Sequence, residues 1–433
     1  MIRIAHFSDL HYGHKTLAEA DRCFGDAIDR AIEARVQAAV LSGDATDHAL
    51  DLHAPAALRL MVQVKRLAEH CPVLILQGTF SHEPLGALSA FRLLGARHPI
   101  HVADRIEQVV LSQEGQWLPS DARRFDKLSG AALALFTCVP TVNKAVVAAT
   151  VGATDAAASV AEHLAALLAG FAPIHREART RDVPTVGVSH GTVFGCLSEH
   201  GVPMAGFDHE FTTGALFAAE ATAFMLGHIH MHQAWTRESG AGVQCIAYAG
   251  SVGRFHFGEQ GDKGFLIWEV GADAASFELH ATPARRTMDI VFEGRPDLAA
   301  LKEAVAQQSL SGTSVRVRWT VAEEDKQAID RAAIQALLGE AAEVKLEGRI
   351  VPVLRTRAAG ISQLAGLADK VRVWAQTTRC NPEPLLACLG RLMSVSPEDI
   401  AQAILQDSNG GSALVCGPAS DGHCAVLSER TCA

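Results

Sequence analysis

Acidic and histidine side chains recur at five places between residues 9 and 230, each time directly after a short apolar stretch. The first place is Asp9-Leu-His11, which follows the alternating segment IRIAHFS. An isolated Asp-x-His pair is also typical of a capping acid beside a solvated histidine, so this pair matters because the pattern repeats. The other candidates are Asp44 in GDATD, His82 in GTFSHE, His190 after TVGVS, and His228 with His230 in GHIH.

Carboxylates mixed with imidazoles suit manganese, iron or zinc better than magnesium or calcium. A structural zinc site takes four ligands and usually includes cysteine, whereas this set offers more ligands than one ion can use. We therefore expect two divalent ions, most simply manganese, that share a bridging carboxylate. Such a pair lowers the pKa of a bound water and hydrolyses phosphate esters.

The apolar stretches before these residues have the length of buried strands. Ile2, Ile4 and Phe7 are expected on one face of the first strand, and helices are expected over about twenty residues from Thr16 and over 55–69. This β-α-β-α-β opening predicts mostly parallel strands with helices on the sheet faces, so that the carboxyl ends of the strands meet at one edge. Further strands are expected at 38–41, 73–76, 131–138, 185–189, 223–226, 244–248, 265–270 and 276–280, and a helix at 155–171.

Beyond Pro283 the pattern changes to that of a small α+β region. Strands are expected at 287–292 and 314–320, and helices at 297–307 and 325–338. The remainder predicts helices near 384–393 and 397–406, followed by a tail rich in glycine, serine and cysteine that we expect to be disordered. The C-terminal cysteines lack a Cys-x-x-Cys pair, which makes a zinc knuckle the less favoured reading.

Composition narrows the class of protein. With 433 residues, 48% hydrophobic and 20% charged, the chain predicts a globular protein of two or three domains. A net charge of −10 argues against a surface that coats nucleic acid, although local basic clusters exist at 123–127, 176–181 and 316–318. No basic, apolar leader is evident and acids interrupt the alanine-rich stretch at 146–172, so we expect a cytoplasmic protein without a membrane span.

Taken in order, the motifs resemble those of the calcineurin-like metallophosphoesterase superfamily: Asp9-x-His11, Gly43-Asp44-x-x-Asp47, a loop ending in His82-Glu83, His190, and Gly227-His228-x-His230. Within that superfamily the chain resembles the SbcD type of DNA double-strand-break repair exonuclease, through AYAGSVGRFHFGEQGDKGFLIWEV at 247–270. The resemblance covers residues 1–280 well, the next region moderately and the tail not at all.

This resemblance implies an α/β fold, a two-sheet α/β sandwich of the metallophosphoesterase type, over residues 1–283. It also implies a small α+β DNA-binding cap over 284–352, and a helical partner-binding segment with a disordered tail over 353–433. Asp44 would bridge the two ions, and His82 would be a catalytic histidine that is not a ligand, with Asp47 and Glu83 orienting imidazoles. The remaining ligands would be Asp9, His11 and His230 for one ion, and His190 and His228 for the other.

One loop departs from the family pattern. The family normally has Gly-Asn-His after the third strand, with the asparagine on the second metal, whereas this chain reads Gly78-Thr-Phe-Ser-His82. Counting back from His82 makes Ser81 the ligand, and counting forward from Gly78 makes it Thr79. Both are neutral hydroxyls, so we expect the second ion to bind more weakly than the first.

The leading functional hypothesis is a metal-dependent DNA exo/endonuclease that acts in DNA repair or recombination. The resemblance implies an SbcC-like coiled-coil ATPase as partner, together with a homodimer. The alternative is a small-molecule or nucleotide phosphodiesterase that uses the same metals. A third reading, an inactive fold that serves as a scaffold, predicts lost ligands, and nearly all of them are present.

Overall fold

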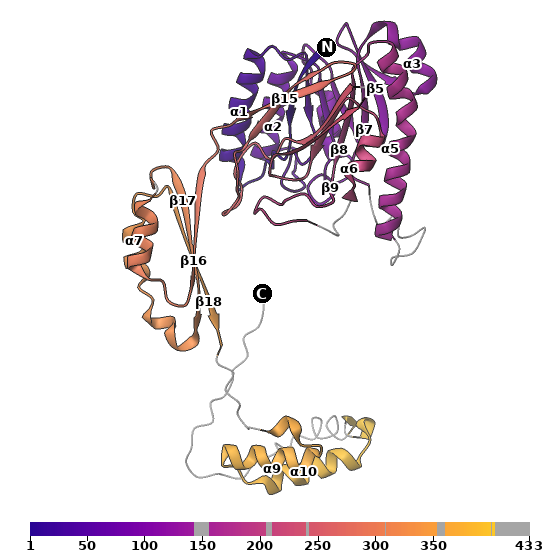
Figure 1. Ribbon diagram of the computed structural model, residues 1–433. Helices are drawn as coiled ribbons and strands as arrows, with labels where there is room; N and C mark the ends of the chain where they lie inside the picture. Colours follow the sequence, from indigo (N-terminus) through magenta and orange to yellow (C-terminus); the bar gives the residue numbers. More distant parts are fainter. Residues whose placement is uncertain are drawn as a thin grey trace. The chain divides into compact units, whose positions relative to one another are not determined.

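The fold is described from a computed structural model over residues 1–142, 156–204, 210–239, 242–307, 309–352, 360–399 and 401–402 (Figure 1). Two stacked sheets form the N-terminal part, with α1 and α2 covering one outer side and α3, α5 and α6 the other (Figure 1). This is the expected two-sheet α/β sandwich.

The first sheet has the strand order β15-β14-β1-β2-β3-β4, in which β1 to β4 are parallel and β14 and β15 antiparallel. Ile2 and Ile4 of β1 face the second sheet, but Phe7 packs with Ala5 against the helices, so its expected side was wrong. The reason is the period of two, which puts residues 2 and 7 on opposite faces. The elements are β1 (Ile2–Phe7), α1 (Leu17–Glu33), β2 (Ala38–Leu41), α2 (Pro55–Ala68), β3 (Val73–Leu76), η1 (Ala87–Leu93), β4 (Ile100–Ala103), β14 (Gly264–Val270) and β15 (Ala275–Ala281).

The second sheet has the order β12-β13-β11-β8-β7-β5-β6, with β13, β11, β8 and β7 parallel. Its inner face meets that of the first sheet in an apolar layer that includes Val40, Leu74, Phe136 and Val188. The elements are β5 (Glu107–Ser112), β6 (Trp117–Ser120), α3 (Ala122–Leu128), η2 (Ser129–Ala131), β7 (Ala132–Val139), α5 (Ala156–Thr180), β8 (Thr185–His190), β9 (Thr192–Val193), β10 (Glu210–Phe211), α6 (Thr213–Ala218), β11 (Ala223–Gly227), β12 (Gln233–Ser239) and β13 (Gly242–Tyr248).

A third, parallel sheet of order β16-β17-β18 follows, with its own apolar core around Val315, Val317 and Trp319. The helix expected over 325–338 is divided in two, because Asp330 leaves the helical backbone and its carboxylate caps a new helix by accepting from the Ala333 amide. The elements are β16 (Arg286–Glu293), α7 (Leu298–Ala306), β17 (Thr313–Ala322), η3 (Glu323–Ala328), α8 (Arg331–Leu337) and β18 (Glu343–Val351).

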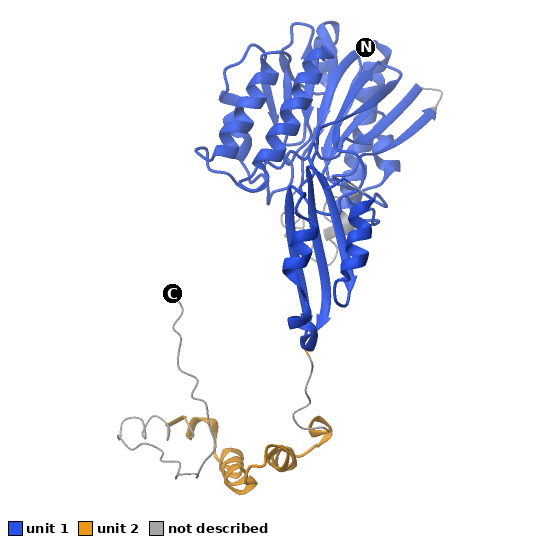
Figure 2. Cartoon of the chain, turned by 90° about the vertical axis from the view of Figure 1, so that its left-hand side faces the viewer, with its two compact units in different colours: residues 1–351 blue, residues 352–433 orange. Residues whose placement is uncertain are grey.

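The chain divides into two compact units, residues 1–351 and 352–433 (Figure 2). The second contains η4 (Ile361–Gln363), α9 (Leu367–Thr378) and α10 (Pro382–Ser394), and α9 was not expected from the sequence. The expected tail lies outside the described residues, as does half of the expected helix over 397–406, whose described residues 397–399 and 401–402 are helical. Among the described helices, none combines the length and apolar character that a membrane crossing requires.

Candidate metal centre

Five loops at the carboxyl ends of parallel strands carry the predicted aspartate and histidine ligands to one place. Backbone hydrogen bonds join the first two loops, since the Asp9 amide donates to the Gly43 carbonyl at 3.1 Å and the His11 amide to the Asp44 carbonyl at 3.0 Å. The other three loops follow β3, β8 and β11. The edge predicted from the β-α-β pattern therefore exists, and both sheets contribute to it.

Strained backbone is concentrated at this edge. Asp9, His11, Asp44 and His228 have φ values of 51°, 46°, 51° and 103°, a region that residues other than glycine rarely adopt. Such conformations persist where the surrounding structure over-determines them, and they cluster at functional sites. Here they turn the side chains of neighbouring loop residues toward a common centre.

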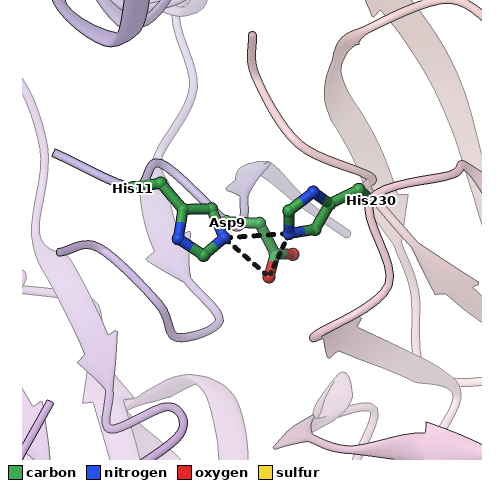
Figure 3. Close-up of side chains that lie close together, drawn as sticks. All are labelled: Asp9, His11 and His230. Carbon is green, nitrogen blue, oxygen red and sulfur yellow. Dashed lines mark hydrogen bonds and ion pairs between the residues drawn. The ribbon is translucent and has the colours of Figure 1, made fainter. Parts of the chain in front are cut away.

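The first cluster consists of Asp9, His11 and His230, which point at one another (Figure 3). The Nε2 atoms of the two histidines lie 2.9 Å apart, and Asp9 Oδ1 lies 4.0 Å from each of them. Asp9 is held in place by the Ser8 hydroxyl, which donates to Oδ2 at 2.5 Å, and by the His228 amide, which lies 3.2 Å from both carboxylate oxygens.

The second cluster consists of Asp44, His190 and His228. His190 donates its Nδ1 proton to the Ser42 carbonyl at 2.8 Å, so that Nε2 faces Asp44 Oδ2 at 3.3 Å. The rings of His190 and His228 are 5.2 Å apart. Gly43 allows this packing, because a Cβ there would lie 2.3 Å from His190 Nδ1.

Burial and charge set the protonation of the two clusters. Burial raises the pKa of Asp9 to about 6 and lowers the pKa of His11 to about 4. Burial, together with the nearby His190, also lowers the pKa of His228 to about 4. Burial opposes charge on His190 too, but the Asp44 carboxylate outweighs it and raises the pKa of His190 to about 9. Most of the imidazoles are therefore neutral near pH 7, as metal ligation requires.

His82 lies beside both clusters. Its Nδ1 hydrogen-bonds the backbone carbonyl of Asp47, which leaves Nε2 3.9 Å from Asp44 Oδ2. The ring of His82 is 5.0 Å from that of His11, and its side chain is 30% exposed. A partly exposed imidazole with one nitrogen fixed and the other free can contact a substrate.

Asp47 lies beside two imidazoles. Its backbone carbonyl accepts from His82 Nδ1, and its carboxylate, which is 42% exposed, lies 3.8 Å from His11 Nδ1. Glu83, by contrast, hydrogen-bonds backbone amides rather than an imidazole. Its buried carboxylate accepts from the Ala45 and Gly78 amides, both at 2.6 Å, and so ties the loops after β2 and β3 together.

Thr79 replaces Ser81 as the hydroxyl at the second cluster. The Thr79 hydroxyl lies 3.1 Å from Asp44 Oδ2 and 3.2 Å from His190 Nε2. Ser81 is exposed, because the His82 and Glu83 amides both bond back to the Thr79 carbonyl and close a turn that carries residue 81 outward. The structure thus places Thr79, the residue reached by counting forward from Gly78, at the second cluster.

A buried ion pair supports the first cluster and was not anticipated. Lys263 Nζ lies 2.6 Å from Glu259 Oε2 and donates to the His230 carbonyl at 2.9 Å. Glu259 also accepts from the amides of Phe255 and His256, and the His256 ring stacks 6.2 Å from that of His230. The only sequence signal was the i,i+4 spacing of these two charges within a glycine-rich turn.

The other nearby histidines are not clustered with the ligands. Nε2 of the buried His6 lies 2.8 Å from the Ser42 hydroxyl, and His232 donates to the Tyr248 carbonyl at 2.7 Å. His14 is exposed.

The donor sets fit divalent metal ions. Two imidazole nitrogens bound at about 2.1 Å to one ion, with their bonds at right angles, lie about 3 Å apart. The observed 2.9 Å between His11 and His230 agrees with that spacing. Each cluster supplies one carboxylate and two imidazoles within 4.8 Å of one another.

No protein-family model matches the chain, and no curated protein matches it. Solved structures similar to it include a dimetal phosphatase from Danio rerio, with 12% identity, a TM-score of 0.39, and coverage of 65% of this chain and 99% of that one. A 5'-nucleotidase precursor from Thermus thermophilus has 16% identity and a TM-score of 0.33 over 65% of this chain. The chain spans 55% of the length of that nucleotidase.

Proposed function

We propose that this chain is a metal-dependent phosphoesterase of the calcineurin-like type that hydrolyses phosphodiester bonds. The observation that carries the proposal is the pair of adjacent, buried Asp/His clusters at one sheet edge, with His82 beside them. Two divalent ions bound there would polarise the phosphate and lower the pKa of an attacking water.

Each residue has a part in this proposal. Asp44, in the loop after β2, would be the carboxylate shared by the two ions, and the Thr79 backbone amide donates to it at 2.7 Å. His82 would contact the scissile phosphate and, when protonated, give a proton from Nε2 to the leaving oxygen. Asp9, His11 and His230 would hold one ion, and His190 and His228 the other. Manganese is the proposed metal, because mixed carboxylate and imidazole ligands suit it.

Within this class we propose DNA as the substrate and an SbcC-like coiled-coil ATPase as the partner. The support is the resemblance of residues 247–270 to the SbcD type, and the place of that segment beside the first cluster, where Lys263 and His256 contact the His230 loop. We also propose a homodimer on the same resemblance.

A small phosphodiester is the second candidate substrate, and the charge pairing favours it. Several arginines of the basic clusters noted in the sequence are paired with acids: Arg316 and Arg318 both bind Asp289, at 2.8 and 2.5 Å. Arg181 binds Asp126 at 2.6 Å in the same way. These arginines are less available to phosphates than the sequence suggested.

The decisive experiment compares two substrates under identical manganese concentrations. Linear duplex DNA, labelled at one end, and bis(4-nitrophenyl) phosphate are each incubated with the protein, with and without a chelator. We expect chelator-sensitive hydrolysis of both. Hydrolysis of the small diester without any cleavage of DNA would assign the second candidate, and inactivity on both would refute the phosphoesterase proposal.

A further inference from the structure

The two clusters have the same side-chain types but would offer different negative charge to an ion if Asp44 is shared between them. Each contains one carboxylate and two imidazoles. If Asp44 is shared, as the proposed function requires, the first ion meets Asp9 in addition to Asp44, whereas the second meets Asp44 alone. The second site therefore depends more on whatever further group completes it.

Thr79 is the side chain in that position. Its hydroxyl is within 3.2 Å of both Asp44 and His190, and its backbone amide fixes the other oxygen of the same carboxylate. Thr79 can come this close to Asp44 because the preceding residue is glycine. A Cβ on Gly78 would lie 2.3 Å from the Asp44 amide nitrogen. The Glu83 carboxylate, bonded to the Gly78 amide, holds the loop there.

Neighbouring residues do not offer a better ligand. The side chain of Gln77 is buried, and its amide donates to the Glu83 carbonyl at 2.9 Å. Ser81 is exposed at the outside of the turn. Thr79 is thus the side chain of this loop within hydrogen-bond distance of the cluster, whereas His82 Nε2 lies 3.9 Å from Asp44 Oδ2.

A hydroxyl is a weak partner for a divalent ion. It is neutral, and in this geometry it is also engaged with the Asp44 carboxylate that the ion needs. Carboxylate, imidazole and amide oxygen ligands bind divalent ions more strongly, and outer partners change affinity by about 10- to 100-fold.

We propose that Thr79 completes the second metal site and makes it the weaker one, so that the two ions bind in sequence. The first ion fills the Asp9–His11–His230 cluster at low metal concentration, and the second binds only as the concentration rises. Because the reaction uses both ions, the free metal concentration controls the active fraction. This inference rests on the proposed two-metal function.

The test is calorimetric titration of the metal-free full chain with manganese, which measures binding and not activity. We expect two events, the second weaker than the first by about tenfold or more. Thr79→Val keeps the shape and the backbone amide but removes the hydroxyl, and it should weaken only the second event. Thr79→Asn should tighten the second event by about tenfold, since it supplies an amide oxygen.

Ser81→Ala is the matched control, a hydroxyl removed two residues away on the same loop, and it should change neither event. Two equally tight events in the wild type, or a second event unchanged in Thr79→Val, would overturn the inference and leave the two-metal function standing. Absence of any manganese binding would instead contradict the proposed function itself. Circular dichroism of each variant separates loss of binding from loss of folding.

Discussion

At the scale of single residues, the site separates groups that would hold metal from a group that would do chemistry. The cluster residues face one another and are mostly buried, whereas His82 has one nitrogen fixed by the Asp47 carbonyl and a side chain that is 30% exposed. The two roles make opposite predictions for metal content and turnover.

His82→Ala should reduce hydrolysis of a nitrophenyl diester by about 10²- to 10⁴-fold while leaving the manganese content unchanged, because His82 is assigned to proton transfer rather than ligation. Elemental analysis and steady-state kinetics on the same sample measure both quantities. Ser81→Ala, on the exposed part of the same loop, is the control. Loss of metal in the His82 variant would show that this histidine is a ligand.

Asp44→Ala should have the opposite effect and remove bound metal, because a bridging carboxylate holds both ions. Asp44→Asn preserves the shape and the bond from the Thr79 amide, so that a loss of metal in this variant reports the charge rather than misfolding. Asp51→Ala, an exposed acid nearby in the chain, serves as control. Full occupancy by elemental analysis in both Asp44 variants would rule out the bridging role.

At the scale of elements, a buried chain of hydrogen bonds joins α5 to the second sheet. Gln108 of β5 donates to the Thr137 hydroxyl at 3.0 Å, and that hydroxyl lies 2.8 Å from Nε2 of His175 in α5. His175 Nδ1 donates to the Ala219 carbonyl at 2.6 Å. These hydrogen bonds require the neutral imidazole, in which Nε2 accepts and Nδ1 donates. Burial lowers the pKa of His175 to about 4 from its ordinary value of 6.5.

Protonation of this histidine should destabilise the fold as the pH falls. Between pH 6.5 and 4 the unfolded chain binds the proton and the folded chain does not, so stability decreases across that window and is independent of this group above it. At pH 5.5 the loss should be ~1.4 kcal/mol. His175→Gln keeps both hydrogen bonds without titrating.

Urea unfolding of the wild type and of His175→Gln at pH 7.5 and 5.5 measures the effect. The free energy of unfolding of the wild type should fall relative to that of the variant as the pH is lowered. A difference that stays constant with pH would mean that His175 is not buried in its neutral form.

At the scale of the whole molecule, the second unit carries an apolar groove between α9 and α10. The groove has a volume of about 450 Å³ and is lined by Leu367, Trp374, Leu385 and Leu392 among others. Leu392 and Met393 are 51% and 69% exposed. The helices pack on each other and still leave apolar surface, and a groove of this kind can accept an amphipathic helix.

We predict that Leu385→Asp combined with Leu392→Asp abolishes binding of the proposed SbcC-like ATPase. Manganese-dependent hydrolysis of a small diester should be retained, because the cluster residues all lie in the first unit. Removal of residues 352–433 should give the same result. Co-purification of the ATPase with tagged variants measures it. Unchanged binding in both variants would place the binding site outside the second unit.

Local patterns in the sequence were sufficient for the core strands and for the order of the candidate ligands. Apolar runs of four to six residues marked β1, β2, β3, β8 and β11 within about one residue, because a strand buried on both faces has few polar positions. The parallel arrangement followed from the alternation of strands and helices. Convergence of the loops then followed from topology alone.

Other features depended on contacts that are distant in sequence. Ser81 and Thr79 are equivalent in type, and only the turn closed by Glu83 decides which one reaches Asp44. The Lys263–Glu259 pair supports His230 across 33 residues of chain. The acid that pairs with both Arg316 and Arg318 comes from a neighbouring strand. Residue types and spacing therefore determined which chemistry was possible, whereas tertiary packing decided which hydroxyl, which carboxylate and which arginine is free to take part.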